Sequence, residues 1–243
     1  MRVLATYNIK GGVGKTSTAV NLAYLSARDG ARTLLWDLDP QGAASFIFRI
    51  KPRVKGGGKG LVRRTSSPED AIKGTDFDGL DLLPADFSYR NLDLVLDAQK
   101  KPIRRLRQLL RPLAEDYDTV ILDCPPGISL VSESVMYAAD TLLIPLIPAR
   151  LSLRTFDQLT DFVTGIEDRP PTLAAFFSMV DRRKRLHRDV VATLTAERGD
   201  LLRTTIPAAS VIEQMAERRA PVHVFAPRSA AAAAYVSLWA ELR

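Results

Sequence analysis

The sequence is poor in the residues that form cross-links and metal centres. Of its 243 residues one is a cysteine, Cys124, and two are histidines, His187 and His223. A single cysteine excludes a disulfide within the chain and any metal site built from several thiolates of one chain. Two histidines argue against a zinc centre. Cys124 lies inside an apolar segment, so we expect it to be a small buried residue.

Long apolar runs are also absent. A membrane-spanning helix needs about 18 or more consecutive apolar residues, whereas the best candidate, residues 141–149, is short and contains two prolines. The first residues, MRVLATYN, lack the apolar core of a signal peptide. With 46% apolar and 26% charged residues, the composition is that of a soluble globular protein. We therefore expect a cytoplasmic protein with one domain, 1–243.

Short apolar runs alternate with amphipathic stretches along the chain. This alternation predicts an α/β fold with a doubly wound, mostly parallel sheet flanked by helices. The expected strands are 3–8, 33–37, 80–84, 119–123, 141–145 and 173–180. The expected helices are 15–28, 102–113, 129–139, 151–166, 187–197 and 229–242. Residues 49–64 hold four glycines, seven basic residues and no acid, which is typical of a mobile loop.

The segment from Asn8 to Thr16 reads NIKGGVGKT and lies between an expected strand and an expected helix. Its glycines allow the backbone N–H groups to point at phosphate oxygens, and the start of the helix adds partial positive charge there. In such a loop Lys15 can bridge the β- and γ-phosphates, and the hydroxyl of Thr16 can ligate Mg²⁺. The nucleotide-binding residues that we expect are Lys10, Gly11, Gly12, Val13, Gly14, Lys15, Thr16 and Ser17.

A carboxylate follows another apolar strand. Asp123 ends the run VILD, where it can hold Mg²⁺ directly or through water. We therefore expect Thr16 and Asp123 to bind the metal.

Four ordered segments give the chain a resemblance to the ParA/MinD family of deviant Walker-A ATPases. The segments are KGGVGKT with its extra lysine, DLDPQG at 37–42, VILDCPPG at 120–127, and SMVDRR at 178–183 followed by TIP at 205–207. The resemblance covers nearly the whole chain and implies the P-loop NTPase fold. It also implies that Lys10 reaches across a homodimer to the other subunit's phosphates, that Asp39 positions the attacking water, and that Met179 and Pro207 lie beside the base. Lys10, Lys15 and Asp39 are thus the expected catalytic residues.

Basic residues are gathered in three clusters. Residues 49–64, 100–111 and 181–188 contain 18 of the 34 lysines and arginines and one acid, Asp181. On a helix, Arg104, Arg107 and Arg111 form a stripe that can follow a phosphate backbone. A solvated helix face is the simpler interpretation of any one cluster. The candidate nucleic-acid contacts are Arg104, Arg107, Arg111, Arg182, Arg183, Lys184, Arg185 and Arg188.

Together these features predict a slow, partner-stimulated ATPase. Its ATP-bound sandwich dimer would bind non-specific DNA, associate with the nucleoid, and segregate or position a cargo through an adaptor protein. Two alternatives remain: a MinD-type membrane-positioning ATPase, and an ATP-dependent ligase of the cobyrinate amidase type. The last residues carry one basic side chain, so we expect no membrane attachment.

Overall fold

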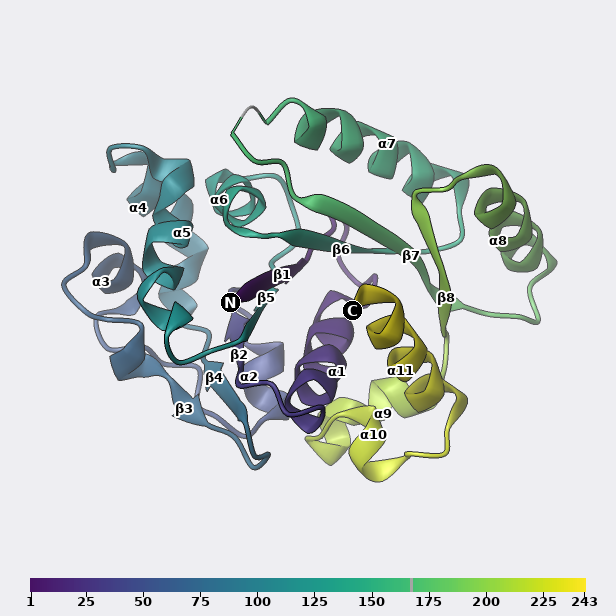
Figure 1. Cartoon of the computed structure of the whole chain (residues 1–243), viewed down its shortest axis with the longest axis horizontal. Coiled ribbons are helices and arrows are strands. Elements are labelled where there is room, and N and C mark those ends of the chain that lie inside the picture. The colour runs from purple at the N-terminus through teal and green to yellow at the C-terminus, as the bar shows by residue number, and fades with distance from the viewer. Residues whose placement is uncertain (167) are drawn as a thin grey trace.

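The computed structural model describes residues 1–166 and 168–243, which form one eight-stranded sheet with helices on both faces (Figure 1). The strand order is β3-β4-β2-β5-β1-β6-β7-β8, and every pair is parallel except β3 with β4. The predicted α/β class and the mostly parallel, doubly wound sheet are confirmed. The strands are β1 (Arg2–Thr6), β2 (Thr33–Asp37), β3 (Lys73–Gly74), β4 (Leu80–Leu83), β5 (Thr119–Asp123), β6 (Thr141–Leu146), β7 (Thr172–Val180) and β8 (Leu201–Pro207).

The helices divide between two hydrophobic cores, one on each face of the sheet. Alternate residues of a strand point to opposite faces, so Val3 and Ala5 join one core and Leu4 joins the other. The first core packs against α5 (Arg105–Leu110), α6 (Leu130–Ala138), α7 (Arg150–Thr164) and α8 (Arg185–Glu197). The second packs against α1 (Lys15–Arg28), α2 (Ala43–Ile47), α9 (Ser210–Arg218), α10 (Val222–Phe225) and α11 (Ala230–Leu242).

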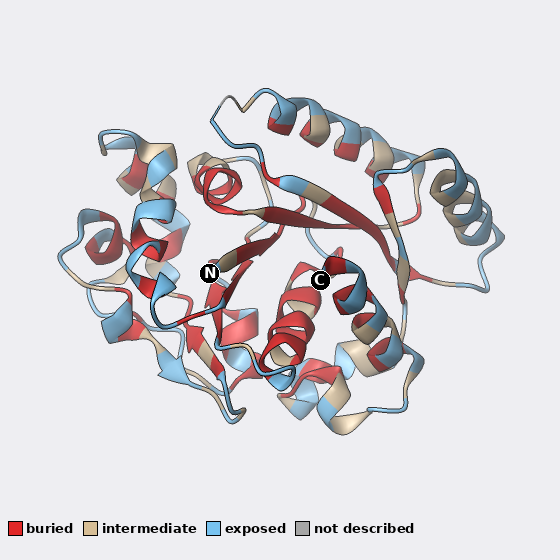
Figure 2. Ribbon diagram, in the orientation of Figure 1, coloured by how far each residue is buried: buried red, intermediate tan, exposed pale blue. Residues whose placement is uncertain are grey.

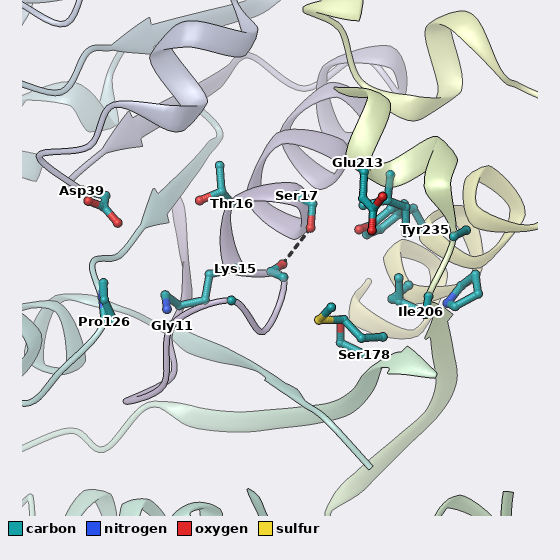
Figure 3. Close-up of a pocket in the computed structure, with 17 residues that line it drawn as sticks. Gly11, Lys15, Thr16, Ser17, Asp39, Pro126, Ser178, Ile206, Glu213 and Tyr235 are labelled. Atoms are coloured by element: carbon teal, nitrogen blue, oxygen red, sulfur yellow. Dashed lines mark hydrogen bonds between the residues drawn. The ribbon is translucent and has the colours of Figure 1, made fainter. Parts of the chain in front are cut away.

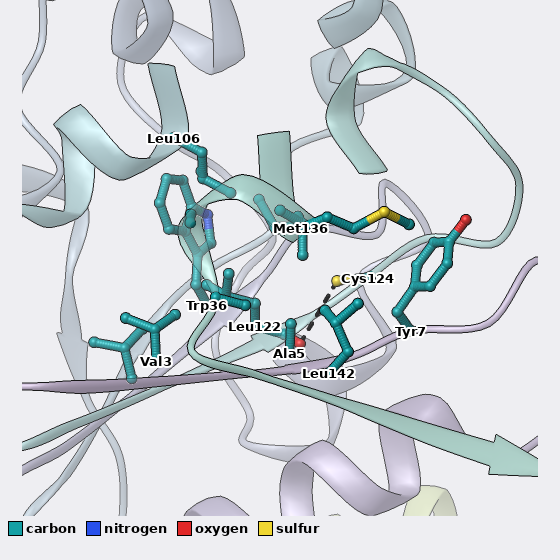
Figure 4. Close-up of a cluster of buried hydrophobic side chains, with 14 of the residues drawn as sticks. Val3, Ala5, Tyr7, Trp36, Leu106, Leu122, Cys124, Met136 and Leu142 are labelled. Carbon is teal, nitrogen blue, oxygen red and sulfur yellow. Dashed lines mark hydrogen bonds between the residues drawn. The ribbon is translucent and has the colours of Figure 1, made fainter. Parts of the chain in front are cut away.

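The central strands are buried on both faces, as their continuous apolar runs predict (Figure 2). Cys124 lies in the first core among Ala5, Leu122, Met136 and Leu142 and is 1% exposed (Figure 4). Its Sγ contacts the carbonyl oxygen of Leu122. The prediction of a small buried residue is therefore confirmed, and the thiol has no access to solvent.

The prediction of a loop over 49–64 is wrong for residues 57–63. Residues Gly57–Arg63 form helix α3, and Leu61 and Val62 are almost fully buried. The glycines permit this packing: a Cβ at Gly58 would lie 2.7 Å from Cδ1 of Leu92, which begins α4 (Leu92–Asp97). The segment is glycine-rich because it packs closely.

The predicted helix over 102–113 is divided. It consists of a 3₁₀ turn (Pro102–Arg104), helix α5, and a second 3₁₀ turn (Pro112–Ala114). Arg111 keeps helical backbone angles, but Pro112 has no N–H to donate to the preceding turn, which explains the break there.

Strand β8 at the edge of the sheet was not expected from the sequence. It contains a bulge, because the three residues of β7 from Ala175 to Phe177 match the five residues of β8 from Leu201 to Thr205. The N–H of Arg203, inside the bulge, donates to Oε2 of Glu241 on α11 at 2.9 Å. An edge strand is less buried than a central one, and the sequence of β8, LLRTTIP, accordingly contains three consecutive polar residues instead of a continuous apolar run.

Candidate nucleotide-binding site

The glycine-rich loop joins β1 to α1 at the carboxyl end of the sheet, as predicted. Gly12 and Gly14 have φ angles of 69° and 95°, in the left-handed region that favours glycine. Gly14 comes directly before α1, and its carbonyl oxygen accepts the first backbone bond of that helix, from the N–H of Thr18. Asn8 fixes the base of the loop by donating to the carbonyl oxygen of Pro145 and accepting from the N–H of Lys10.

A cavity of about 430 Å³ opens above this loop (Figure 3). Predicted residues that line it are Gly11, Gly12, Gly14, Lys15, Thr16, Ser17, Asp39, Met179 and Pro207. Val13, Lys10 and Asp123 are not among the described residues that line it. Val13 and Asp123 are buried, with exposures of 1% and 0%. The cavity size is that of a small-molecule site.

The two lysines of the loop have different surroundings. Lys15 is 7% exposed, and its Nζ donates to the carbonyl oxygen of Lys10 at 2.9 Å, across the loop. Burial lowers the pKa of the Lys15 amine, while the nearby charges of Asp123 and Asp39 oppose that shift. Lys10 is half-buried, and both its backbone polar groups are bound within the loop.

Asp123 offers a free metal ligand. One carboxylate oxygen, Oδ1, accepts from the hydroxyl of Thr6, whereas Oδ2 is buried without a hydrogen-bond partner among the described residues. Burial and the nearby charge of Asp37 raise the pKa of Asp123, and the hydroxyl of Thr16 opposes the shift. A buried carboxylate oxygen without a partner is costly unless a cation binds it. Asp123 and Thr16 therefore fit Mg²⁺, which takes few protein ligands besides phosphate oxygens.

No larger metal centre is present in residues 1–166 and 168–243. They contain no group of three or more histidine, cysteine or acidic side chains that could hold an ion. A metal at this site would thus be held jointly by the protein and by phosphates.

Asp37 and Asp39 flank the end of β2 and have separate roles in the geometry. Asp37 is fully buried and accepts from both the N–H and the hydroxyl of Ser45, at 2.8 and 2.7 Å. The same hydroxyl accepts from the N–H of Ala85 after β4. Burial raises the pKa of Asp37 to about 6. Asp37 therefore anchors the segment that follows β2, whereas Asp39 points into the cavity.

Four side chains at the far end of the cavity escaped the sequence prediction: Ser178, Ile212, Glu213 and Tyr235. Tyr235 comes from α11, more than 200 residues from the loop, and burial raises its pKa to about 12 against the neighbouring hydroxyls of Ser17 and Thr18. In the sequence, Tyr235 belongs to the segment 229–242, which predicts a packed terminal helix. The Ala208-Ala209 pair lines the cavity beside Pro207.

The basic clusters lie at two ends of the sheet. Arg107 lies on helix α5, with Arg104 directly before the helix and Arg111 directly after it. Residues Arg182, Arg183, Lys184, Arg185 and Arg188 precede or begin α8, which packs next to β7 and β8 (Figure 1). Asp181 partly neutralises the second group, because Arg183 binds its carboxylate with two nitrogens, at 3.0 and 3.1 Å. The other members of that group are exposed.

A glycine-rich loop before a helix, a buried lysine and a buried carboxylate at the end of a neighbouring strand define a P-loop nucleotide-binding protein. A family model described as an AAA domain matches residues 1–175. The sporulation initiation inhibitor protein Soj of Bacillus subtilis is 30% identical, with 99% of this chain and 98% of Soj covered. The chromosome partitioning protein ParA of Caulobacter vibrioides is 30% identical, with 100% and 94% covered.

Solved structures agree in fold. McdA of Cyanothece in complex with ATP superposes with a TM-score of 0.87 at 20% identity, covering 100% of this chain and 96% of that one. Cobyrinic acid a,c-diamide synthase of Mycobacterium smegmatis, with ADP and magnesium bound, gives 0.83 at 28% identity, covering 99% and 93%. The chain belongs to the ParA/MinD family of P-loop ATPases, as its motifs predict.

Proposed function

We propose that the protein is a ParA-like ATPase in which ATP controls a sandwich dimer that binds DNA without sequence specificity. Hydrolysis returns it to monomers with weak DNA affinity. The cycle segregates or positions DNA or a protein cargo on the nucleoid, through an adaptor protein that also stimulates hydrolysis. Relatives named for chromosome partitioning support this proposal.

The site residues divide the work of phosphoryl transfer. The loop N–H groups and Lys15 bind the phosphates, and Thr16 and Asp123 hold Mg²⁺, which neutralises charge that develops on the phosphate oxygens. Asp39 orients the attacking water, since its carboxylate faces the cavity from the segment that Asp37 anchors. Lys10 lies outside the described cavity lining, which suits a residue that acts on the phosphates of the other subunit.

The DNA-binding part of the proposal rests on strand β7, whose end lines the cavity and leads into the basic cluster at 181–188. Ser178 and Met179 line the cavity, and the arginine cluster begins three residues after Met179. Met179 has a φ of 55°, a left-handed conformation that costs energy in a non-glycine residue. Helix α8 that follows has no fully buried residue. Nucleotide at the cavity therefore contacts the strand end that leads directly into the basic cluster.

The test is binding to a random-sequence duplex without nucleotide, with ADP and with ATP, at two salt concentrations. We expect ATP-dependent, salt-sensitive binding. Lys10→Ala is expected to abolish the ATP dependence by preventing dimer formation, and Asp39→Ala to retain the DNA-bound state by blocking hydrolysis. Lys73→Ala, which removes an exposed lysine on β3, is the matched control. Absence of DNA binding in every nucleotide state would refute the proposal.

A second candidate function follows from the 28% identity to cobyrinic acid a,c-diamide synthase. A small-molecule ligase of that kind would consume ATP only with its carboxylate substrate and would ignore DNA. The same binding experiment, with ATP hydrolysis measured in parallel, separates the two.

A MinD-type membrane-positioning ATPase is the third candidate function. None of the described helices is long and apolar enough to cross a bilayer. The apolar side chains of α11, including Leu238 and Trp239, pack into the second core and are not free to enter a lipid surface. We expect no sedimentation with anionic vesicles in the presence of ATP.

A further inference from the structure

Two of the three basic clusters in the sequence come together in the folded protein. Helices α3 and α5 pack side by side, far from α8 (Figure 1). Arg64, at the end of α3, and Arg105, on α5, both donate to Oε1 of Gln108, each at 3.1 Å. Arg105 also donates through Nε to the carbonyl oxygen of Val62. One amide oxygen thus holds two guanidinium groups in fixed positions.

Within the described residues these guanidinium groups form no ion pair, although Glu69, Asp70 and Asp168 lie nearby. Among residues 1–166 and 168–243, no carboxylate forms an ion pair with Arg64, Arg105, Arg107 or Arg111. Burial and the charge of Arg64 lower the pKa of Arg105, as expected for like charges held together. We call these four residues the α3–α5 arginine surface.

The surface extends over two adjoining hollows that share Arg111. One, of about 540 Å³, is lined also by Arg104, Arg107 and Arg169, and the other, of about 490 Å³, by Arg64 and Gln108. The ring of Tyr137 supports Arg107 from below, with its centroid 5.6 Å from the guanidinium carbon. In the first hollow Arg169 is paired with Asp140 at 2.8 Å and Arg104 with Asp168 at 2.9 Å, which leaves Arg107 and Arg111 as its unpaired arginines within the described residues. The second is bordered by Glu69 and Asp70. An extended line of guanidinium groups suits a polyanion better than a single ion.

The α3–α5 arginine surface lies at the amino ends of the strands, whereas the nucleotide cavity lies at their carboxyl ends. The larger hollow is lined by Val3 in β1 and by Asp140 and Arg169, which precede β6 and β7. The nucleotide cavity is at the carboxyl ends of the same strands, and the 182–188 cluster follows one of those ends. A dimer that closes over the nucleotide therefore leaves the α3–α5 arginine surface exposed on each subunit.

We propose that the α3–α5 arginine surface is a second contact with the DNA phosphate backbone, and that it acts in every nucleotide state. This inference rests on the proposed DNA binding and assigns a regulatory difference to the clusters. The 182–188 cluster supplies the ATP-dependent affinity. The α3–α5 surface supplies a constant, weaker affinity that keeps the ADP-bound protein near DNA.

The test compares two double variants with equal loss of charge, Arg107→Gln/Arg111→Gln and Arg182→Gln/Lys184→Gln. Fluorescence anisotropy measures their binding to a random-sequence duplex with ADP and with ATP over a range of salt. Loss of two phosphate contacts in the first variant is expected to weaken binding roughly tenfold in both nucleotide states and to reduce the salt slope by about 2. The second variant is expected to lose affinity mainly with ATP.

Three outcomes overturn the inference. If Arg107→Gln/Arg111→Gln binds the duplex as tightly as the wild type in both nucleotide states, and binding still depends on ATP, the inference is refuted and the proposed function stands. If that variant binds DNA more weakly only with ATP, the α3–α5 arginine surface does not act in every nucleotide state. Binding of a polyglutamate peptide in place of the duplex, abolished by the same substitutions, assigns the surface to an acidic partner protein. If the wild type binds no DNA in any state, the proposed function itself fails.

Discussion

Gly14 gives the sharpest test of how the phosphate loop is held. Its φ of 95° is one that side chains rarely allow, and a Cβ there would lie 2.8 Å from Oγ of Ser178 on β7. A left-handed backbone costs an L-residue about 1–2 kcal/mol. Forcing a methyl group into a filled site costs about 1–3 kcal/mol more. Gly14→Ala is therefore expected to lower the free energy of unfolding by about 2–5 kcal/mol.

The two costs can be separated by a second substitution. Removing Oγ with Ser178→Ala leaves the Cβ of residue 178 at 4.0 Å, an ordinary contact. The double variant Gly14→Ala/Ser178→Ala should thus recover the steric part, about 1–3 kcal/mol, relative to the sum of the single variants. The strain of the backbone should remain.

Urea unfolding without nucleotide measures these differences apart from any effect on binding. Gly11→Ala is the control, because a Cβ there meets nothing within 4 Å and the residue has no left-handed φ. Its stability should stay within about 0.5 kcal/mol of the wild type. Equal losses in the Gly11 and Gly14 variants, or no recovery in the double variant, would show that the close approach of loop and strand is not what constrains Gly14.

Three further outcomes can be measured. Asp123→Asn should remove most of the Mg²⁺-dependent gain in nucleotide affinity, seen by calorimetry with and without the metal, because Oδ2 is the buried oxygen left free for a cation. Burial raises the pKa of Asp37 from 3.8 to about 6, so the folded protein binds the proton more tightly and stability falls as the pH rises through that range. Asp37→Asn should flatten the decline, and an unchanged pH profile would contradict this. Gly58→Ala should cost about 1–3 kcal/mol in thermal or urea unfolding, because its Cβ would meet Leu92, whereas Gly199→Ala should be neutral; equal effects would mean that α3 is loosely packed.

The central sheet and the phosphate loop could be predicted because their signals are local. A strand buried on both faces needs a continuous apolar run, and all six expected strands coincide with observed ones to within two residues at each end. The loop is recognisable because glycines, Lys15 and Thr16 must stand at fixed spacing. Asp123 follows from its position after such a strand.

The features that could not be predicted from the sequence depend on contacts between distant segments. Tyr235 reaches the cavity only because α11 packs beside α1, and no local pattern encodes that arrangement. The sequence predicts a loop in place of helix α3 because glycines favour a flexible backbone. Only the folded structure shows that Leu92 and Tyr89 pack against Gly58. The joining of Arg64 to Arg105 through Gln108 is likewise a property of the folded chain alone.

The bulge in β8 has a consequence for assembly. An open sheet invites another strand at its edge, since unpaired N–H and C=O groups there accept a new chain. At this edge Glu241 already occupies the amide of Arg203, and a strand pairing there would have to displace a carboxylate and straighten the bulge. At the opposite edge β3 has two residues, too few to template a long partner. Both edges of the sheet therefore disfavour the edge-to-edge pairing of copies of this protein into fibres.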